Sequence, residues 1–301
     1  MLDCALIVIS YRSARDVAGL IATVPAAVSG LSWRLLVVNN DPAEDLGMVV
    51  APHAEVEVVE ADGNLGYAGG INLALASAPK SRWIIFLNPD VRLTPGSIAA
   101  MTACAGNEHA VVPKIVDDDG TVQRSLRREP TVLGSLGDAL FGDHWDNRPS
   151  WFSEMVREPS VYQRRHEVDW ATGAALVVPA AAVRVVGAWD AKRFFLYSEE
   201  TDYCRRLRCS GTGVYYSPAA VVSHRGGGSG TSDALHALLE VNRVRYFRKW
   251  HQPLAAGAFA AVVVLNNLLR IRRSRSRAAL RALLFSSTRS ALPGRGDRAR
   301  P

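Results

Sequence analysis

Residues 83–90 read Trp-Ile-Ile-Phe-Leu-Asn-Pro-Asp, and this stretch indicates the fold of the chain. Five apolar residues in a row predict a strand that is buried on both faces, as in a parallel sheet covered by helices. Pro89 fixes φ and has no N–H to donate, so the strand should end there. Asp90 would then lie in a rigid turn at the carboxyl end of the strand, where open α/β sheets bind ligands. A carboxylate in that place suits a divalent cation that carries a diphosphate.

The first 115 residues alternate short apolar runs with helical stretches. The predicted strands are Cys4–Ile9, Arg34–Val38, Val56–Val59, Trp83–Leu87 and Ala110–Val112, and the predicted helices are Ala14–Val28, Tyr67–Ser77 and Ser97–Ala105. This alternation predicts βαβ units and therefore an α/β fold with a mostly parallel sheet flanked by helices.

The second part of the chain is less regular. We expect a surface loop or a partly disordered stretch over residues 142–165, one strand over Val168–Val178 and a helix over Glu200–Cys209. Two short strands are expected over Gly213–Ser217 and Ala219–Ser223, and an amphipathic helix over Asp233–Trp250. The sequence contains no internal repeat.

The charge is distributed unevenly along the 301 residues, whose formal net charge is +6. Residues 243–301 hold 14 of the 35 Lys and Arg residues but one of the 29 Asp and Glu residues, so this segment carries +13 and residues 1–242 carry −7. An acidic body with a basic tail predicts an anionic partner surface for the tail, either lipid headgroups or nucleic acid. The four cysteines show no metal-binding spacing, and we expect reduced thiols.

Polar residues follow the first two predicted strands. Ser10 and Tyr11 come after the first, and Asn39, Asn40 and Asp41 after the second. Such groups can hold a nucleotide base and ribose, although Asn and Asp also favour ordinary turns.

A glycine-rich stretch opens the next helix, with Asn64 and Gly66 within it. Small residues at a helix N-terminus allow close approach of a phosphate. The stretch matches neither the GxGxxG nor the Walker pattern, so a plain turn explains it equally well.

A second acidic cluster lies far downstream. Glu199, Glu200 and Asp202 follow the aromatic run 194–197. They fit either the acidic first turn of a helix or a carboxylate tuned by partial burial. His224 ends the last predicted strand, beside the glycine loop 226–230, and could be structural or could bind metal or diphosphate.

Seven motifs together resemble a known family. They read, in order, Ser-Tyr (10–11), Asn-Asn-Asp (39–41), Gly-Asn-Leu-Gly-Tyr-Ala-Gly-Gly-Ile-Asn (63–72), Leu-Asn-Pro-Asp (87–90), Trp-Ala-Thr-Gly-Ala-Ala-Leu (170–176), Phe-Phe-Leu-Tyr-Ser-Glu-Glu-Thr-Asp-Tyr-Cys-Arg-Arg-Leu (194–207) and His-Arg-Gly-Gly-Gly-Ser (224–229). Over residues 4–250 the chain resembles family 2 inverting glycosyltransferases of the GT-A fold, and most closely the rhamnosyltransferase branch.

The resemblance implies roles for individual residues. Asp90 matches the last aspartate of the metal-binding DxD motif, in which Asn88 replaces the first, and Asp41 matches the residue that binds the pyrimidine base. Glu200 matches the expected catalytic base, with Glu199 and Asp202 as rivals. His224 matches a histidine that completes the metal site in some relatives. The segment lining the acceptor pocket corresponds to Trp170, Thr172 and Gly173.

The implied activity is the transfer of a sugar from a nucleotide donor, with Mg²⁺ or Mn²⁺ as cofactor. The branch suggests dTDP-L-rhamnose as donor and a polyprenyl-diphosphate-linked saccharide as acceptor, in the synthesis of bacterial envelope polysaccharide. One alternative is a nucleotidyltransferase, but that class has a glycine-rich loop with Arg or Lys where residues 10–13 read Ser-Tyr-Arg-Ser. Another is a nucleotide-binding module with a nucleic-acid-binding tail, but Phe285 is the one aromatic residue between Ile271 and Pro301.

The expected organisation has three parts. Residues 1–230 form a catalytic domain, with a nucleotide-sugar half (1–115) and an acceptor half (116–230); residues 231–285 form amphipathic and basic helices; residues 286–301 form a disordered tail. The apolar run Leu254–Leu269 is short for a transmembrane helix, and arginines follow it. We therefore expect a cytoplasmic protein, without a signal peptide, that associates peripherally with the inner face of the membrane and does not bind nucleic acid.

Overall fold

The computed structural model describes residues 1–224 and 232–294. Its strands are β1 (Leu2–Ser10), β2 (Trp33–Asn39), β3 (Val56–Glu60), β4 (Ser81–Leu87), β5 (Val91–Leu93), β6 (Ala110–Val116), β7 (Leu126–Arg127), β8 (His166–Glu167), β9 (Trp170–Ala171), β10 (Ala175–Pro179) and β11 (Val214–His224).

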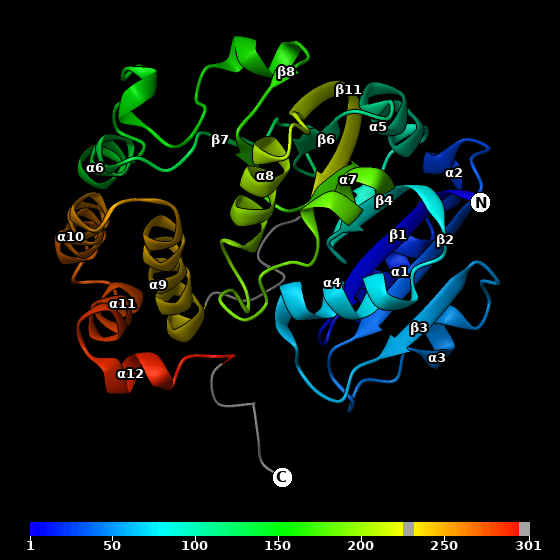
Figure 1. Cartoon of the computed structure of the whole chain (residues 1–301), viewed down its shortest axis with the longest axis horizontal. Coiled ribbons are helices and arrows are strands. Elements are labelled where there is room, and N and C mark those ends of the chain that lie inside the picture. Colours follow the sequence, from blue (N-terminus) through cyan, green and yellow to red (C-terminus); the bar gives the residue numbers. More distant parts are fainter. Residues whose placement is uncertain (225–231, 295–301) are drawn as a thin grey trace.

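The helices lie on both faces of the sheet and in a separate group beside it (Figure 1). They are α1 (Ala14–Ile21), α2 (Val24–Val28), α3 (Gly47–Val50), α4 (Gly66–Ser77), α5 (Ser97–Ala105), α6 (Val132–Phe141), α7 (Ala180–Val186), α8 (Glu199–Cys209), α9 (Asp233–Trp250), α10 (Pro253–Leu269), α11 (Ser274–Leu284) and α12 (Ser286–Ser290), with short 3₁₀ turns at Ser150–Phe152 and Pro159–Gln163.

The main sheet has the order β3-β2-β1-β4-β10-β6-β11-β5, with β8 paired to β11. Strands β1 to β4 run parallel, β10 is antiparallel to both of its neighbours, and β6 is parallel to β11. The fold class is thus the expected one: a mostly parallel α/β sheet flanked by helices.

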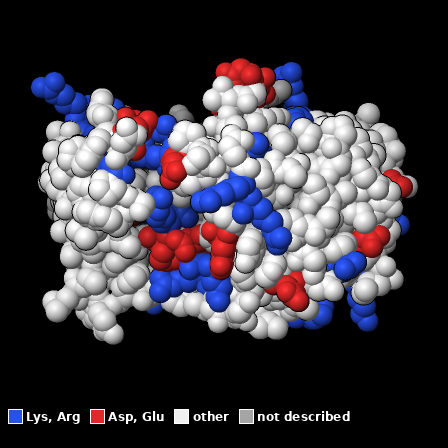
Figure 2. Space-filling model, turned by 90° about the horizontal axis from the view of Figure 1, so that it is seen from above, with Lys and Arg blue, Asp and Glu red and all other residues white. Residues whose placement is uncertain are grey.

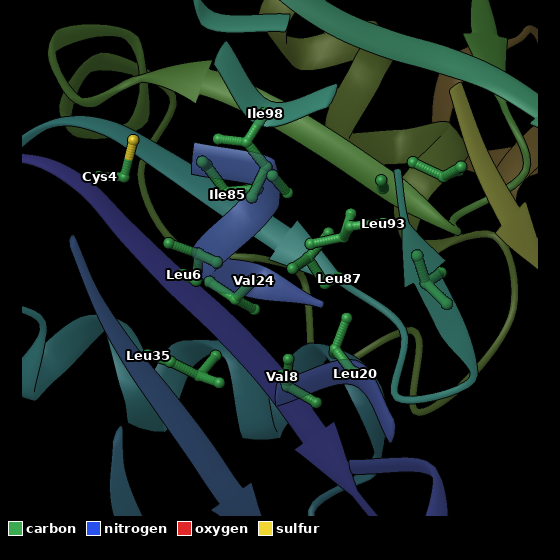
Figure 3. Packing of buried hydrophobic residues seen from close by; sticks show 14 of the residues in the cluster. Cys4, Leu6, Val8, Leu20, Val24, Leu35, Ile85, Leu87, Leu93 and Ile98 are labelled. Carbon is green, nitrogen blue, oxygen red and sulfur yellow. The ribbon is translucent and has the colours of Figure 1, made fainter. Parts of the chain in front are cut away.

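Both faces of the sheet are buried because β1 alternates between two cores. Its residues Cys4, Leu6 and Val8 pack with α1, α2 and α5 (Figure 3), and the residues between them pack with α4, α7 and α8. Each fully buried aliphatic side chain contributes ~1.5–3 kcal/mol. The continuous apolar runs of the sequence therefore reflect burial on two faces rather than alternation.

Helices α9, α10 and α11 form a separate group with α6. Phe247 of α9 stacks on Phe259 of α10 with ring centroids 4.0 Å apart. The group is joined to the rest of the chain by ion pairs such as Arg243–Glu154 (3.0 Å) and Lys249–Asp190 (2.8 Å). Figure 2 shows acidic and basic side chains close together near this junction on one face of the molecule.

Several expected elements differ from the structure. The helix expected over Ala14–Val28 is two helices, because Pro25 has no N–H to continue the first. The strand expected over Val168–Val178 is β9 and β10, which belong to different sheets. The two strands expected around Pro218 are one strand, β11, with a register shift between Ser217 and Val221.

The tail also differs in part. Residues 286–301 were expected to be disordered, but α12 spans Ser286–Ser290. Residues 295–301 lie outside the described residues, as do Arg225 and the glycine loop 226–230. The boundary expected at residue 230 stays a prediction.

Candidate active site

The polar residues after β1 and β2 lie side by side, because Ser10 and Asn39 are register partners. Both are tied into the protein: the hydroxyl of Ser10 donates to Oε2 of Glu44 (3.0 Å), and Nδ2 of Asn39 donates to Oε2 of Glu60 (3.0 Å). Both side chains are buried beneath the surface at this edge of the sheet. Tyr11 is exposed beside them.

Asp41 faces Arg12 across the same edge. Nε of Arg12 donates to Oδ2 of Asp41 at 2.8 Å, and this bond holds the pKa of Asp41 below its usual value. Asp41 is thus an ionised acceptor that a ligand donor group can reach.

The glycine-rich stretch makes close backbone contacts. Nδ2 of Asn40 donates to the carbonyl of Gly66 (2.9 Å), and Oδ1 of Asn64 accepts from the Gly66 N–H (3.0 Å). Gly66 has φ +70°, and a Cβ there would overlap Phe195. The N–H of Tyr67 donates to the Phe195 carbonyl (2.8 Å). This part of the stretch therefore joins α4 to the loop before α8, a role that sequence reasoning did not assign to it.

Asp90 lies beside His224, with Nε2 of His224 3.2 Å from Oδ1 of Asp90. Burial alone would raise the pKa of Asp90, but the hydrogen bond and charge of His224 outweigh it, and the pKa is lowered. Asn88 is half-buried at the start of the same turn, and its N–H donates to the Ala174 carbonyl (2.9 Å).

The Asp90–His224 pair fits a divalent cation. One carboxylate oxygen and one imidazole nitrogen suit Mn²⁺ or Mg²⁺ and leave positions for diphosphate oxygens and water. Within residues 1–224 and 232–294, no group of three or more His, Cys, Asp or Glu side chains could hold a metal by itself.

Glu199 and Glu200 begin α8. Oε2 of each is buried and has no hydrogen-bond partner among the described residues. Burial raises the pKa of Glu199 well above its usual value, and the charge of Glu200 adds to this; burial also raises the pKa of Glu200. The turn before them holds Tyr197 (φ +70°) and Ser198 (φ +68°) in the left-handed region, which is costly for these residues; such strain clusters at functional sites.

Asp202 has a different environment, although it is two residues from Glu200. Its carboxylate accepts from Nε of Arg206 (3.0 Å), Nε1 of Trp250 (2.9 Å) and Nζ of Lys249 (2.7 Å), and its side chain is fully buried. Each of its oxygens is already bonded, so Asp202 anchors α9 to α8.

The residues expected at the acceptor site lie against Glu200. Thr172, Gly173 and Glu200 line a small internal cavity of about 10 Å³, with Tyr67 and Trp189 among the other residues. A Cβ at Gly173 would be 3.8 Å from Cγ of Glu200, an ordinary van der Waals contact, so Gly173 lies directly beside that side chain. Trp170 is not among the residues that line this cavity, and its Nε1 donates to the Arg128 carbonyl (3.0 Å).

Tyr67 connects the two acidic clusters. Its ring meets Trp189 edge-on at 6.0 Å. Burial raises the pKa of Tyr67, and the charges of Glu199, Glu200 and Asp90 raise it further. The two clusters, more than a hundred residues apart in the sequence, are therefore both near enough to Tyr67 for their charges to act on its phenol, and Tyr67 and Glu200 line the same cavity.

Sequence reasoning missed two residues of this site. Arg127 is half-buried, makes no ion pair with a described residue, and lowers the pKa of Glu200 by its charge. Nδ2 of Asn242 on α9 donates to the carbonyls of Leu196 (2.8 Å) and Tyr197 (3.3 Å), and so holds the left-handed turn. Strand β7 pairs with β9, and Arg127 is the register partner of Trp170. A sequence analysis that predicted this pairing would have placed Arg127 beside a residue expected at the acceptor site.

Comparison with known proteins agrees with this geometry. The model of the glycosyl transferase family 2 matches residues 5–165. The chain belongs to glycosyl transferase family 2. This membership favours glycosyl transfer over both alternatives, nucleotidyl transfer and a non-enzymatic nucleotide-binding module.

The curated relatives include a rhamnosyltransferase and a hexosyltransferase. The N-acetylglucosaminyl-diphospho-decaprenol L-rhamnosyltransferase of Mycobacterium tuberculosis is 28% identical over 76% of this chain and 81% of its own length. The low-salt glycan biosynthesis hexosyltransferase Agl10 of Haloferax volcanii is 24% identical over 68% of this chain and 62% of its own length. This family 2 chain is therefore rhamnosyltransferase-like.

Solved structures share the fold. GalNAc-T7 with UDP, GalNAc and Mn²⁺ gives a TM-score of 0.56 at 12% identity, covering 90% of this chain and 55% of that chain. TarS 1–349 of S. aureus gives 0.53 at 13% identity, covering 96% of this chain and 92% of that one. At these identities the likeness is one of fold, that of GT-A glycosyltransferases.

Proposed function

We propose that this family 2 glycosyltransferase inverts configuration while it moves L-rhamnose from dTDP-L-rhamnose to a polyprenyl-diphosphate-linked saccharide in bacterial envelope synthesis. The observation that carries the proposal is the presence of two acidic clusters near Tyr67: Asp90 beside His224, and the pair Glu199 and Glu200, whose Oε2 atoms are buried and have no partner among the described residues. The choice of rhamnose and of a lipid diphosphate rests on the relative from Mycobacterium tuberculosis, whose name contains both.

In this proposal the donor lies along the carboxyl ends of β1, β2 and β4. Asp41 accepts from the pyrimidine base, and Ser10, Tyr11, Asn39 and Asn40 line the base and ribose. Asn64, Gly66 and Asn88 lie toward the diphosphate. Asp90 and His224 hold Mg²⁺ or Mn²⁺, which would offset the negative charge of the departing nucleoside diphosphate.

Glu200 is the proposed base. It lines the cavity with Thr172 and Gly173, whereas Glu199 is more deeply buried and Asp202 is fully bonded. A raised pKa suits a base that works near neutral pH. Glu200 removes the proton from the acceptor hydroxyl as that oxygen attacks the anomeric carbon; the bond to the diphosphate breaks in the same displacement, which inverts the configuration.

The acceptor is a lipid, and α10 fits a role at the membrane surface. One face of α10 packs inward through Ala256, Phe259 and Val263. The opposite face runs from Leu254 (91% exposed) to Leu268 (47% exposed), with small apolar residues between them and no charged residue in the helix. An exposed face without charge is unusual on a protein surface and fits burial in the apolar part of a bilayer interface.

Helix α6 extends this apolar face. Leu133 and Leu140, two helical turns apart, are both exposed, and Nη1 of Arg270 donates to the Ala139 carbonyl of α6 (2.9 Å). Exposed arginines of the following segment flank the face, namely Arg272, Arg273, Arg275, Arg277 and Arg281. Each contributes ~1 kcal/mol near an anionic lipid surface. We propose that the protein docks there from the cytoplasmic side.

A bilayer-spanning role for α10 is not supported. No helix in the described parts of the chain has both the length and the apolarity that a transmembrane pass requires.

A panel of nucleotide sugars with a lipid-diphosphate-linked acceptor tests the proposed function. The expected result is release of nucleoside diphosphate from dTDP-L-rhamnose when the acceptor is present. If a different nucleotide sugar is the one that releases its nucleoside diphosphate, that sugar is the donor and rhamnose is excluded. If no nucleotide sugar does so, the proposed function is wrong.

A further inference from the structure

A second, larger pocket is lined in part by the loop that precedes Glu199. Its volume is about 410 Å³, within the range of pockets that hold small ligands. Lys192, Arg193 and Arg245 line it together with Asp190, Phe195 and Gly294. Residues of three distant segments thus enclose one space beside the candidate active site.

Among the described residues that line the pocket the charge is net positive, because the one acidic residue there is already neutralised. Asp190 accepts from Nη1 of Arg193 (3.0 Å) and from Nζ of Lys249 (2.8 Å). Burial would raise the pKa of Asp190, but these cations outweigh it and lower the pKa. Lys192 is exposed and makes no ion pair within residues 1–224 and 232–294. The remaining positive charge suits an anion with several oxygens.

Phe195 is shared between this pocket and the candidate active site. Its carbonyl accepts from the Tyr67 N–H, and its ring lies against Gly294, where a Cβ would overlap it. The same loop leads within four residues to Glu199. An anion in the pocket would therefore lie against the loop that leads to Glu199 and Glu200.

The helical group supplies the other wall. Arg245 comes from α9, and Pro293 and Gly294 follow α12. These elements pack with α11, which also carries part of the basic surface next to α10. The pocket thus adjoins both the loop that leads to the proposed base and the helical group that carries the proposed lipid-facing helix.

We propose that this pocket binds the diphosphate of the lipid-linked acceptor. The inference rests on the proposed function, in which the donor diphosphate is held separately at Asp90 and His224. Holding the acceptor diphosphate beside the loop fixes the distance between the lipid anchor and Glu200. The pocket therefore selects acceptors whose saccharide is short enough to bring its hydroxyl to that base.

Binding of two probes to the full-length protein tests the pocket without turnover. The probes are inorganic diphosphate and farnesyl diphosphate, titrated calorimetrically with a chelator present so that no metal assists binding at Asp90. Lys192→Gln and Arg193→Gln should each weaken binding about tenfold, as expected for loss of one charge-assisted hydrogen bond. Arg184→Gln, which removes an exposed charge from α7, is the matched control and should bind like the unaltered protein.

The outcomes separate the pocket from the donor site. Asp90→Ala should bind both diphosphate probes like the unaltered protein, whereas Lys192→Gln should bind them more weakly. Equal affinity in all variants, or loss in Asp90→Ala alone, would overturn the pocket. With turnover, Lys192→Gln should raise KM for the lipid-linked acceptor and leave KM for the donor unchanged. If probe binding responds as expected while no sugar is transferred, the pocket stands and the proposed function fails.

Discussion

Nε2 of His224 lies 3.2 Å from Oδ1 of Asp90, so the end of β11 and the turn after β4 meet at one point of the sheet edge. The two residues come from the two halves of the chain. A carboxylate and the neutral form of an imidazole, so placed, are a suitable donor set for a divalent cation. Each half of the fold thus contributes one ligand to the proposed metal site.

Removal of that carboxylate should abolish transfer. We expect Asp90→Ala to lower kcat/KM by about 10³-fold, because charge stabilisation by a metal contributes several kcal/mol. Nucleotide release with and without added Mn²⁺ measures this. Asp118→Asn, on an exposed turn, is the control. Full activity of Asp90→Ala in excess chelator would exclude the metal site.

The three carboxylates at the start of α8 should respond differently to substitution. Glu200→Gln should lower kcat ~10²–10⁴-fold while donor affinity is unchanged, since a base acts in the chemical step. Asp202→Asn should mainly lower the melting temperature, because Lys249 and Arg206 lose their partner. If Glu199→Gln is the variant that loses turnover and Glu200→Gln is active, the base is Glu199.

Burial of Glu199 should make stability depend on pH. A carboxyl whose pKa is raised by folding favours the folded state below its ordinary value of 4.5, and this contribution is lost as pH rises through the raised value. Glu199→Gln should therefore melt at a higher temperature than the unaltered protein at about pH 8 and at the same temperature at about pH 4. The expected difference at pH 8 is roughly 2–4 °C for each kcal/mol gained in the free energy of unfolding. Thermal unfolding across this range measures it, with exposed Glu55→Gln as control. A constant difference at every pH would mean that Glu199 does not titrate in this window.

Arg127 should set the pH at which the proposed base becomes active. Its charge opposes the rise in the pKa of Glu200, so Arg127→Gln should move the acidic limb of the pH–rate profile to higher pH. Arg127→Lys should restore the profile in part. Arg124→Gln removes a nearby arginine that is paired with Asp146 and should leave the limb in place. An unmoved limb in Arg127→Gln would exclude this electrostatic role.

The apolar face of α10 should govern membrane association. Leu254→Glu with Leu268→Glu should weaken partition to anionic liposomes at least about tenfold, because each buried leucine contributes ~1.5–3 kcal/mol. Both side chains point away from the packed face, so these changes spare the fold better than deletion of α10. Met48→Glu with Val185→Glu, at other exposed apolar positions, is the matched control in flotation. Equal flotation of the two double variants, or none by either, would remove the membrane role from α10.

Local patterns predicted the elements of the first half well. The helix at Ser97–Ala105 has the predicted bounds, and the strand at 83–87 ends at the predicted proline turn. These elements depend on neighbours in sequence: continuous apolar runs, a fixed φ at Pro89, and glycines that end helices.

Other elements depend on partners that a sequence does not reveal. Helix α6 was missed because Gly134 and Gly137 lower its helix propensity, yet Gly137 is required there by the close approach of Phe152. Asp202 is a rival of Glu200 for the role of catalytic base when the sequence alone is considered, because both lie in the same turn of the helix. Its bonds to Lys249 and Trp250 become visible only when α9 packs on α8.

The anomeric configuration of the product tests the central claim most directly. The enzyme is incubated with dTDP-L-rhamnose and a lipid-diphosphate-linked acceptor, and the new linkage is determined by NMR, with Glu200→Gln as the blank. We predict a single glycosidic product of inverted configuration that Glu200→Gln does not form. A product of retained configuration, or an equal yield from Glu200→Gln, would contradict a single displacement assisted by that carboxylate.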